Sequence, residues 1–181
     1  MPETGFEEDV PKRSIVIYDS RFGNTKIIAE ALERGLEESE IETTCVDAKK
    51  VNVSLLKCYD LICIGAPTEE FTASVAIKQF LDKLQNEQPD LQGKFGFAFD
   101  TRVAPGILGS AARPIERDLK KNLKMTVIAP HQTTIVTSIR KHGAIVGAEL
   151  KEGEEKKFEE IGRSLGSILR QSSIPETPIV I

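Results

Sequence analysis

The chain has 181 residues, a length that suits one domain of ordinary size better than two. Hydrophobic residues make up 40% and charged residues 29%, a globular mix that allows a substantial core. The formal net charge of −4 argues against a dedicated nucleic-acid binder and leaves room for a basic protein partner. No apolar run approaches the ~18 residues of a membrane span, and the acidic N-terminus lacks a secretory signal, so we expect a cytoplasmic protein with no membrane or nucleic-acid partner.

Continuous apolar runs alternate with helical patterns along residues 13–171. Such runs are typical of strands buried on both faces of a parallel sheet. They predict strands at residues 14–18, 41–46, 60–65, 94–99 and 125–129, the last resuming at 133–137. Apolar residues at i, i+3 and i+4 spacing predict helices around residues 28–36, 77–84, 110–123 and 154–171, and Asn52 predicts the cap of a further short helix. The alternation predicts one α/β domain with a five-stranded parallel sheet and helices on both faces.

Proline and glycine predict where these elements are interrupted. Pro130 cannot donate to a strand ladder, so we expect a bulge or break in the fifth strand. Residues 140–151, with Gly143 and Gly147, are expected to form a loop. Residues 1–12 are expected to be a flexible tail. The C-terminal tail, residues 172–181, is either a frayed end or an extended arm that docks on a neighbouring surface or subunit.

The turn between the first predicted strand and the first helix is the clearest candidate binding site. In an open parallel sheet, ligands bind outside the carboxyl ends of the strands, where this turn lies. Amides at a helix N-terminus have no intrahelical partner and face a bound anion, and Gly23 lets the backbone approach closely. Ser20 and Thr25 hydroxyls and the Asn24 amide add donors, so the turn predicts a phosphate site. The alternative is an ordinary helix cap satisfied by solvent.

Other sites of α/β proteins fit this chain poorly. There is no GxGxxG after the first strand and no GxxxxGK[ST], so dinucleotide folds and P-loop hydrolases are disfavoured. Asp19 and Asp60 are arranged unlike the acidic residues of response regulators, because the third strand ends in Gly-Ala-Pro-Thr without a phospho-acceptor aspartate.

Three segments together resemble the flavin loops of flavodoxins. They are the phosphate-loop pattern YxSxxGNT at residues 18–25, Gly-Ala-Pro-Thr at residues 65–68, and Phe-Asp-Thr-Arg at residues 99–102. The resemblance covers about residues 13–170 and implies a three-layer, flavodoxin-like fold with strand order 2-1-3-4-5. It also implies FMN as cofactor. The cofactor-binding residues that it implies are Ser20, Arg21, Phe22, Gly23, Asn24 and Thr25 around the phosphate, and Pro67, Thr68, Glu69, Asp100, Thr101 and Arg102 beside the ring and the ribityl chain.

The two ring loops depart from the family pattern. Typical flavodoxins hold the flavin between aromatic side chains, but this chain has no Trp, and Tyr18 and Tyr59 lie outside both loops. Phe71 is the one aromatic residue of the second loop, and it either packs within the loop or touches the flavin. Stacking adds about 0.5–1.5 kcal/mol per pair, so FMN binding is expected to be weakened rather than abolished.

Arg102 and the nearby carboxylates would act on the flavin potential in opposite directions. Glu69, Glu70 and Asp100 could supply a negative field, unless the glutamates form only a solvated pair. Arg102 is either a flavin contact or a solvated surface residue. As a flavin contact, its charge would raise the potential, so we expect a less negative reduced couple than in usual flavodoxins.

The remaining reactive and charged residues fit structural roles best. Cys45, Cys58 and Cys63 show no CxxC or metal-ligand spacing and are read as buried thiols rather than redox or metal sites. Cations gather in the predicted helix at residues 110–123, as a solvated face or as a docking face for an acidic partner.

The sequence therefore favours an FMN-binding electron-transfer protein, as a monomer or weak homodimer with an unidentified redox partner. The alternatives are an FMN-dependent NAD(P)H or quinone-type reductase and a non-flavin scaffold. No catalytic residue or metal ligand is assigned.

Overall fold

Five parallel strands form the centre of the computed structural model, which describes residues 11–69, 72–103 and 109–172. These strands are β1 (Arg13–Tyr18), β2 (Glu42–Asp47), β3 (Leu61–Glu69), β5 (Phe95–Val103) and β7 (Gln132–Lys141). They lie in the order β2-β1-β3-β5-β7, which confirms the predicted order of the five parallel strands. Two short strands, β4 (Thr72–Ala73) and β6 (Thr126–Val127), pair with β3 and β5, and β8 (Ala144–Leu150) is added at the edge.

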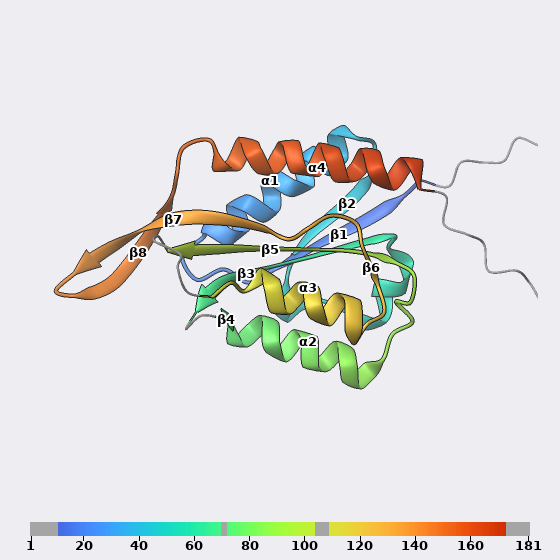
Figure 1. Ribbon diagram of the computed structural model, residues 1–181, viewed down its shortest axis with the longest axis horizontal. Helices are drawn as coiled ribbons and strands as arrows, with labels where there is room; N and C mark the ends of the chain where they lie inside the picture. Colours follow the sequence, from blue (N-terminus) through green and yellow to red (C-terminus); the bar gives the residue numbers. More distant parts are fainter. Residues whose placement is uncertain (1–10, 70–71, 104–108, 173–181) are drawn as a thin grey trace, which may run out of the picture.

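Helices cover both faces of the sheet (Figure 1). The helices α1 (Asn24–Glu38) and α4 (Glu154–Gln171) lie on one face, and α2 (Val75–Glu87) and α3 (Ala112–Lys121) lie on the other. Two 3-10 helices, Ala48–Lys50 and Val53–Cys58, add to the α2–α3 side, and the Asn52 side chain caps the second of them as predicted. The three layers are those expected from the alternating strands and helices.

Successive residues of the central strands supply the two cores. In β1, Ile15 and Ile17 join the core beneath α2 and α3, whereas Val16 joins the core beneath α1 and α4. All three are at most 4% exposed. Because side chains alternate across a strand, only a strand covered on both faces needs an uninterrupted apolar run. This is why the sequence shows runs of apolar residues and no alternation at these positions.

The helices α1 and α4 touch through glycines. A Cβ atom on Gly35 would lie 2.0 Å from the carbonyl oxygen of Glu159, and one on Gly162 would lie 2.4 Å from that of Leu32. Both distances are far below any contact that a methyl group tolerates, so the two backbones approach more closely than larger residues would permit. Ion pairs from Arg34 to Glu155 and Glu159 bridge the same helices at the surface.

The fifth parallel strand is interrupted where Pro130 predicts a break. β6 and β7 both pair with β5 in parallel, and the residues between them, including Pro130, belong to neither strand. Pro114 lies in the first turn of α3, where a missing amide hydrogen costs least.

The predicted loop at residues 140–151 is wrong, because most of this segment is strand. β7 continues to Lys141 and turns back into β8, which pairs with it antiparallel and extends beyond the body of the sheet (Figure 1). The two turn residues, His142 and Gly143, have φ values of 49° and 82°. Positive φ at both central positions defines a turn whose twist matches a two-residue hairpin, so the glycine marks the turn of a β-hairpin.

Cys45 and Cys63 lie in strands β2 and β3, but the prediction of a buried thiol is wrong for Cys58, which lies at the end of the 3-10 helix Val53–Cys58. Cys63 is fully buried in β3 and Cys45 is partly buried in β2, whereas Cys58 is exposed. Burial raises the pKa of both strand thiols, that of Cys45 to about 12. The reactive thiolate form is therefore disfavoured at these two positions.

The predictions for the two tails fall mostly outside the described residues, which begin at residue 11 and end at residue 172. Within the described ranges, no helix has the length and apolar character that crossing a membrane requires.

Candidate functional site

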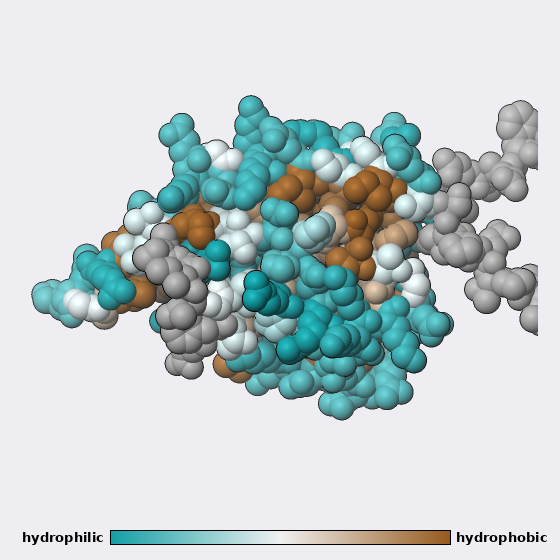
Figure 2. Space-filling view, in the orientation of Figure 1, coloured by the Kyte–Doolittle hydropathy of each residue, from teal (hydrophilic) through white to brown (hydrophobic). Residues whose placement is uncertain are grey.

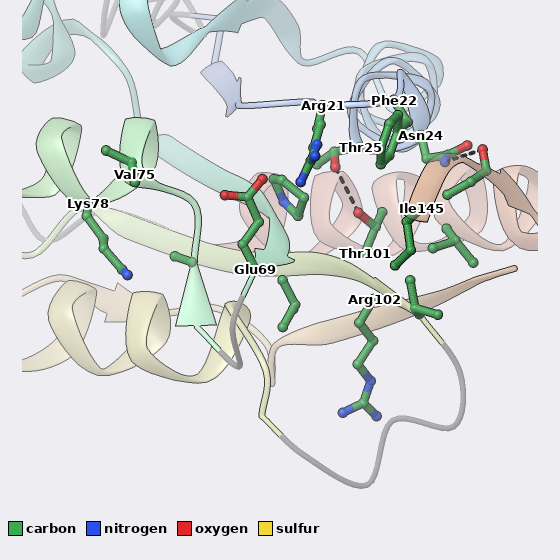
Figure 3. A pocket seen from close by; sticks show the side chains of 16 residues that line it. Arg21, Phe22, Asn24, Thr25, Glu69, Val75, Lys78, Thr101, Arg102 and Ile145 are labelled. Atoms are coloured by element: carbon green, nitrogen blue, oxygen red, sulfur yellow. Dashed lines mark hydrogen bonds between the residues drawn. The ribbon is translucent and has the colours of Figure 1, made fainter. Parts of the chain in front are cut away.

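A cavity of about 390 Å³ opens at the carboxyl ends of the central strands (Figure 3). Nine of the twelve predicted site residues line it. The first loop contributes Arg21, Phe22, Asn24 and Thr25, the end of β3 contributes Pro67, Thr68 and Glu69, and the end of β5 contributes Thr101 and Arg102. Ser20, Gly23 and Asp100 lie outside the lining. The sheet topology thus brings together three loops that are separate in the sequence.

The first loop ends in a turn that only glycine adopts without strain. Gly23 is the residue before α1 and has a φ of 86°, in the left-handed region. Its carbonyl accepts the first helical hydrogen bond, from the Ile27 amide, at 3.0 Å. The Ser20 hydroxyl accepts a hydrogen bond from the Lys26 amide at 3.3 Å, so Ser20 caps the helix.

Other amides of this turn remain available. Within the described part of the chain, the amides of residues 21–25 have no hydrogen-bond acceptor. Unpaired amides at the start of a helix, together with its dipole, form an anion site. A simple helix cap by Ser20 therefore satisfies the Lys26 amide but leaves the amides of residues 21–25 without a partner in the described structure.

Thr25 joins the first loop to the third. Its hydroxyl shares a 2.8 Å hydrogen bond with the hydroxyl of Thr101, and both side chains are buried (Figure 3). Either hydroxyl can be the donor. If Thr101 donates, the Thr25 hydroxyl keeps its own hydrogen for a second acceptor.

The Asn24 side chain has a partner that the sequence does not suggest. Its amide nitrogen donates to the Ala148 carbonyl oxygen of β8 at 2.9 Å. This bond ties the β7–β8 hairpin, residues 132–150, to the first loop. An amide nitrogen has two hydrogens, so the second is still available.

Asp100 has a structural role that differs from the predicted contact with a cofactor. Its side chain is fully buried, and one carboxylate oxygen accepts hydrogen bonds from the Thr68 hydroxyl, the Ser110 hydroxyl and the Ala112 amide at 2.7–3.2 Å. The carboxylate therefore caps the N-terminus of α3 and holds Thr68 in place. Thr68 in turn accepts from the Ala111 amide at 3.1 Å.

Half of the cavity lining is polar or charged, and the apolar half is almost entirely non-aromatic. Phe22 is the one aromatic residue among the described lining residues, and the Arg21 guanidinium lies 5.0 Å from its ring centroid. Val103, Val136 and Ile145 form much of the remaining apolar surface. The predicted roles of Glu70 and Phe71 concern residues outside the described ranges.

Several lining residues were not predicted from the sequence. They are Ala73 of β4, Val75 and Lys78 at the start of α2, Val103 at the end of β5, and Val136, Ile145 and Ala148 of the hairpin. Reading residues 140–151 as a loop concealed the hairpin contribution. The run of β-branched residues from Thr133 to Thr137, followed by Ile139, was the available signal for a strand longer than predicted.

The charged side chains of the cavity are mainly cationic. Arg21, Lys78 and Arg102 line it, against the single carboxylate of Glu69. Arg102 extends away from the first loop, and its guanidinium donates to the Gly109 carbonyl oxygen at 3.1 Å (Figure 3). Asp100 does not line the cavity, and the hydrogen bonds that it accepts come from neutral groups, so its charge still contributes to the field near the cavity.

The arrangement of these loops can be compared with the sequence models of known protein families. The sequence model of the flavodoxin domain matches residues 15–142, which include the three loops at the cavity. The chain belongs to the flavodoxin domain family. This confirms the resemblance seen in the three loop segments.

Relatives and solved structures agree with this membership. A flavodoxin from Aquifex aeolicus (strain VF5) is 29% identical over 157 residues, 83% of each chain. A flavodoxin from the domain Archaea has a TM-score of 0.72 at 23% identity, with 87% of this chain and 99% of that chain covered. Flavodoxin 1 from Bacillus cereus has a TM-score of 0.71 at 20% identity, covering 86% and 98%.

Larger proteins contain the same fold. The flavodiiron protein from Giardia intestinalis has a TM-score of 0.67 at 18% identity, and the match covers 87% of this chain but only 36% of that one. At these identities the structural matches show the fold alone. Membership in the flavodoxin family supports, in general terms, a flavin-binding role in electron transfer.

Proposed function

We propose that this flavodoxin-family protein binds FMN, holds its phosphate on the Ser20–Thr25 turn and transfers electrons. The observation that carries the proposal is the free amides of residues 21–25 at the mouth of α1, beside a cavity of about 390 Å³. Neutral amide dipoles and a helix N-terminus suit a phosphate dianion. Hydroxyl groups of Ser20 and Thr25 lie within the same turn and can donate to it.

The cavity residues fit the rest of FMN. Pro67, Thr68 and Glu69 would lie along one side of the ring, and Thr101 and Arg102 would approach the other side and the ribityl chain. Asp100 would act indirectly, since it fixes Thr68 through a 3.0 Å hydrogen bond. Phe22 and the aliphatic residues of the hairpin would supply apolar contact in place of a pair of large aromatic rings.

The composition of the cavity favours a carrier over a catalyst with its own reactive groups. Bound FMN would supply the redox chemistry, and the protein would supply binding, orientation and field. Glu69 is the single carboxylate of the described lining, which contains no cysteine or histidine. The chain's own task would be to hold the flavin and admit a partner.

An FMN-dependent reductase of a quinone or similar acceptor is the second candidate. The aliphatic wall of Val103, Val136 and Ile145 favours it, because such a wall leaves more room at one ring face than a stacked tyrosine or tryptophan would. Turnover of NAD(P)H with a quinone, by purified protein loaded with FMN, would select the reductase.

One experiment separates these proposals from a scaffold without flavin. The purified full-length protein is examined for flavin absorbance and titrated with FMN, with quenching of flavin fluorescence as the signal. We expect saturable binding of one FMN per chain and negligible NAD(P)H oxidation. Colourless protein that leaves FMN fluorescence unchanged would select the scaffold.

A further inference from the structure

We propose that the β7–β8 hairpin is a docking surface for an acidic electron-transfer protein. The docking surface is the protruding end of the hairpin with Ile139, Arg140, Lys141, Ile145 and Val146. Arg140 and Ile145 lie on one face of the hairpin, and Ile139 and Lys141 lie on the other. This inference rests on the proposed electron-transfer function and adds the chemistry of the partner. It runs against the overall charge, since the chain as a whole is acidic, with a net charge of −4.

Exposed apolar side chains gather at this end of the molecule. Nine large hydrophobic residues of the described ranges are exposed, and six of them line the cavity or lie on the hairpin. These six are Phe22, Val75, Val103, Ile139, Ile145 and Val146. Exposed apolar residues that cluster in this way mark interaction sites, whereas scattered single ones need no explanation.

A ligand in the cavity would leave part of this cluster uncovered. Ile145 lines the cavity, but Ile139 and Val146 do not, and they are 40% and 49% exposed. Figure 2 shows apolar surface on the hairpin next to hydrophilic surface at its tip. Ile139 and Val146 therefore both belong to the hairpin that forms one wall of the cavity, and Ile139 lies on the hairpin face opposite Ile145.

The local charge is opposite to the overall charge. Arg140 and Lys141 flank the turn of the hairpin, and Arg21, Lys78 and Arg102 line the adjoining cavity. Against these five cations, the cavity lining and the hairpin hold two carboxylates, Glu69 and Glu149. A cationic area of this kind attracts an anionic partner and speeds its association.

The five cations also differ from others of the chain in having no carboxylate partner. Arg34, Arg163 and Arg170 all pair with glutamates of the α1–α4 side. Within the described residues, none of the five forms an ion pair, and Arg140 donates only to the Gly143 carbonyl oxygen, at 3.3 Å. Arg140 and Lys141 lie outside the cavity lining, so their charge stays available to a partner when a ligand occupies the cavity.

The hairpin is held in a defined position beside the cavity. Its two-residue turn has the backbone twist that suits tight hairpins, and Asn24 donates to Ala148. A partner on the docking surface would therefore lie next to Ile145 and the cavity mouth, so that an electron could pass from reduced flavin to the partner's oxidised metal centre. A preformed surface loses little entropy on binding.

The basic face of α3 is the competing surface, because Arg113, Arg117 and Lys121 are also unpaired in the described structure. It lacks the exposed apolar residues of the hairpin. Two exposed residues of this helix, Arg117 and Lys121, therefore provide a control with the same change of charge.

The test is an NMR titration of the full-length, isotope-labelled protein with two probes at low salt. One probe is a small acidic blue-copper protein in its reduced state, and the other is a basic c-type cytochrome. We expect the acidic probe to shift amide signals of residues 136–150, and 0.3 M salt to abolish the shifts. Arg140→Glu/Lys141→Glu should weaken binding tenfold or more, and Arg117→Glu/Lys121→Glu should weaken it less than twofold.

Three results would overturn the proposal. They are shifts centred on α3, equal or stronger hairpin binding by the basic cytochrome, and self-association of the protein through the hairpin without a probe. If the charge-reversal variant Arg140→Glu/Lys141→Glu does not give the NMR spectrum of a folded protein, the charge-neutralising variant Arg140→Gln/Lys141→Gln is used instead. The titration needs no flavin, so a colourless protein that binds the acidic probe would reject the electron-transfer function and keep the surface. A flavin-loaded protein that fails to bind it would reject only the surface.

Discussion

The hydroxyls of Thr25 and Thr101 share a 2.8 Å hydrogen bond that joins the start of α1 to the end of β5. Thr25 is 1% exposed and Thr101 is 5% exposed, so solvent does not replace this bond. We infer that Thr101 donates to Thr25 when phosphate is bound, which leaves the Thr25 hydrogen for a phosphate oxygen. Thr101 is then a positioning residue that acts through Thr25.

Thr101→Val should weaken FMN binding about fivefold to tenfold, because a hydrogen bond of this kind contributes about 1 kcal/mol. The variant should bind riboflavin, which has no phosphate, as the parent does. Flavin fluorescence titrations with both ligands measure the two effects. Thr101→Ser, which keeps the hydroxyl, is the matched control and should restore FMN binding. An equal loss for both flavins would show that Thr101 shapes the cavity and does not act on the phosphate.

Gly35→Ala should lower the free energy of unfolding by about 2–4 kcal/mol. Alanine favours helices, but its Cβ would meet the Glu159 carbonyl oxygen at 2.0 Å, and moving a packed helix costs more than the gain in propensity. Urea denaturation measures the change. Ser164→Ala, at an exposed position of α4, should alter stability by less than about 0.5 kcal/mol. A Gly35→Ala protein as stable as the parent would show that the close approach of α1 and α4 is not needed.

Arg102→Gln should make the reduction potential of bound FMN more negative by about 40 mV. A cation near the ring stabilises the added electron, and an interaction of about 1 kcal/mol corresponds to this shift for one electron. Potentiometric titration of the loaded proteins gives the value, with Arg117→Gln on the exposed face of α3 as the control. An unchanged potential would place the Arg102 charge too far from the ring to matter, in keeping with its bond to Gly109.

Glu116 should make part of the stability sensitive to acid. Burial alone would raise the pKa of its carboxyl, but hydrogen bonds from Lys120 and from the His131 amide and ring, with the Lys120 charge, lower it to about 2. The folded pKa lies below the usual 4.5, so this contribution is present above pH 4.5 and is lost as the pH falls toward 2.

The Glu116→Gln variant isolates this contribution. It should be about 1 kcal/mol less stable than the parent at pH 7, and the difference should shrink as the pH falls to 3. At that pH the Glu116 carboxyl of the unfolded chain is largely protonated, whereas that of the folded chain is still ionised, so folding carries a proton-release cost that offsets the stabilisation. Urea denaturation of parent and variant at pH 7 and pH 3 measures the difference in the free energy of unfolding. The contributions of the other acidic groups are the same in both proteins and largely cancel. A difference that is the same at both values would mean that Glu116 acts through packing.

Elements with a clear apolar period could be predicted from the sequence. Central strands such as β1 are buried on both faces, and α4 begins at residue 154 and ends at residue 171, as its spacing predicts. Pro130 marks the break in the fifth strand, because a proline has no amide hydrogen to donate to a strand ladder, whatever residues surround it. The β7–β8 hairpin was not predicted because β8 is largely exposed and its residues do not alternate between apolar and polar types.

Roles that depend on distant partners were harder to predict. Asp100 follows a strand at the cavity, but the groups that bind it, at residues 110 and 112, lie ten or more positions away. The close packing of Gly35 could not be predicted, because nothing in the local sequence shows that Gly162 lies opposite. The net charge only left room for a basic partner. A sum over the chain does not show which cations are paired with glutamates and which, such as Arg140 and Lys141, have no ion pair in the described residues.

The ratio of the dissociation constants for riboflavin and FMN tests the central claim most directly. Both share the ring and the ribityl chain, so the ratio isolates the phosphate and its contacts with the amides of residues 21–25. We predict that FMN binds at least tenfold more tightly than riboflavin, since hydrogen bonds to a charged group contribute about 1.5–3 kcal/mol each. Equal affinity for the two flavins, or no binding of either, would contradict the account.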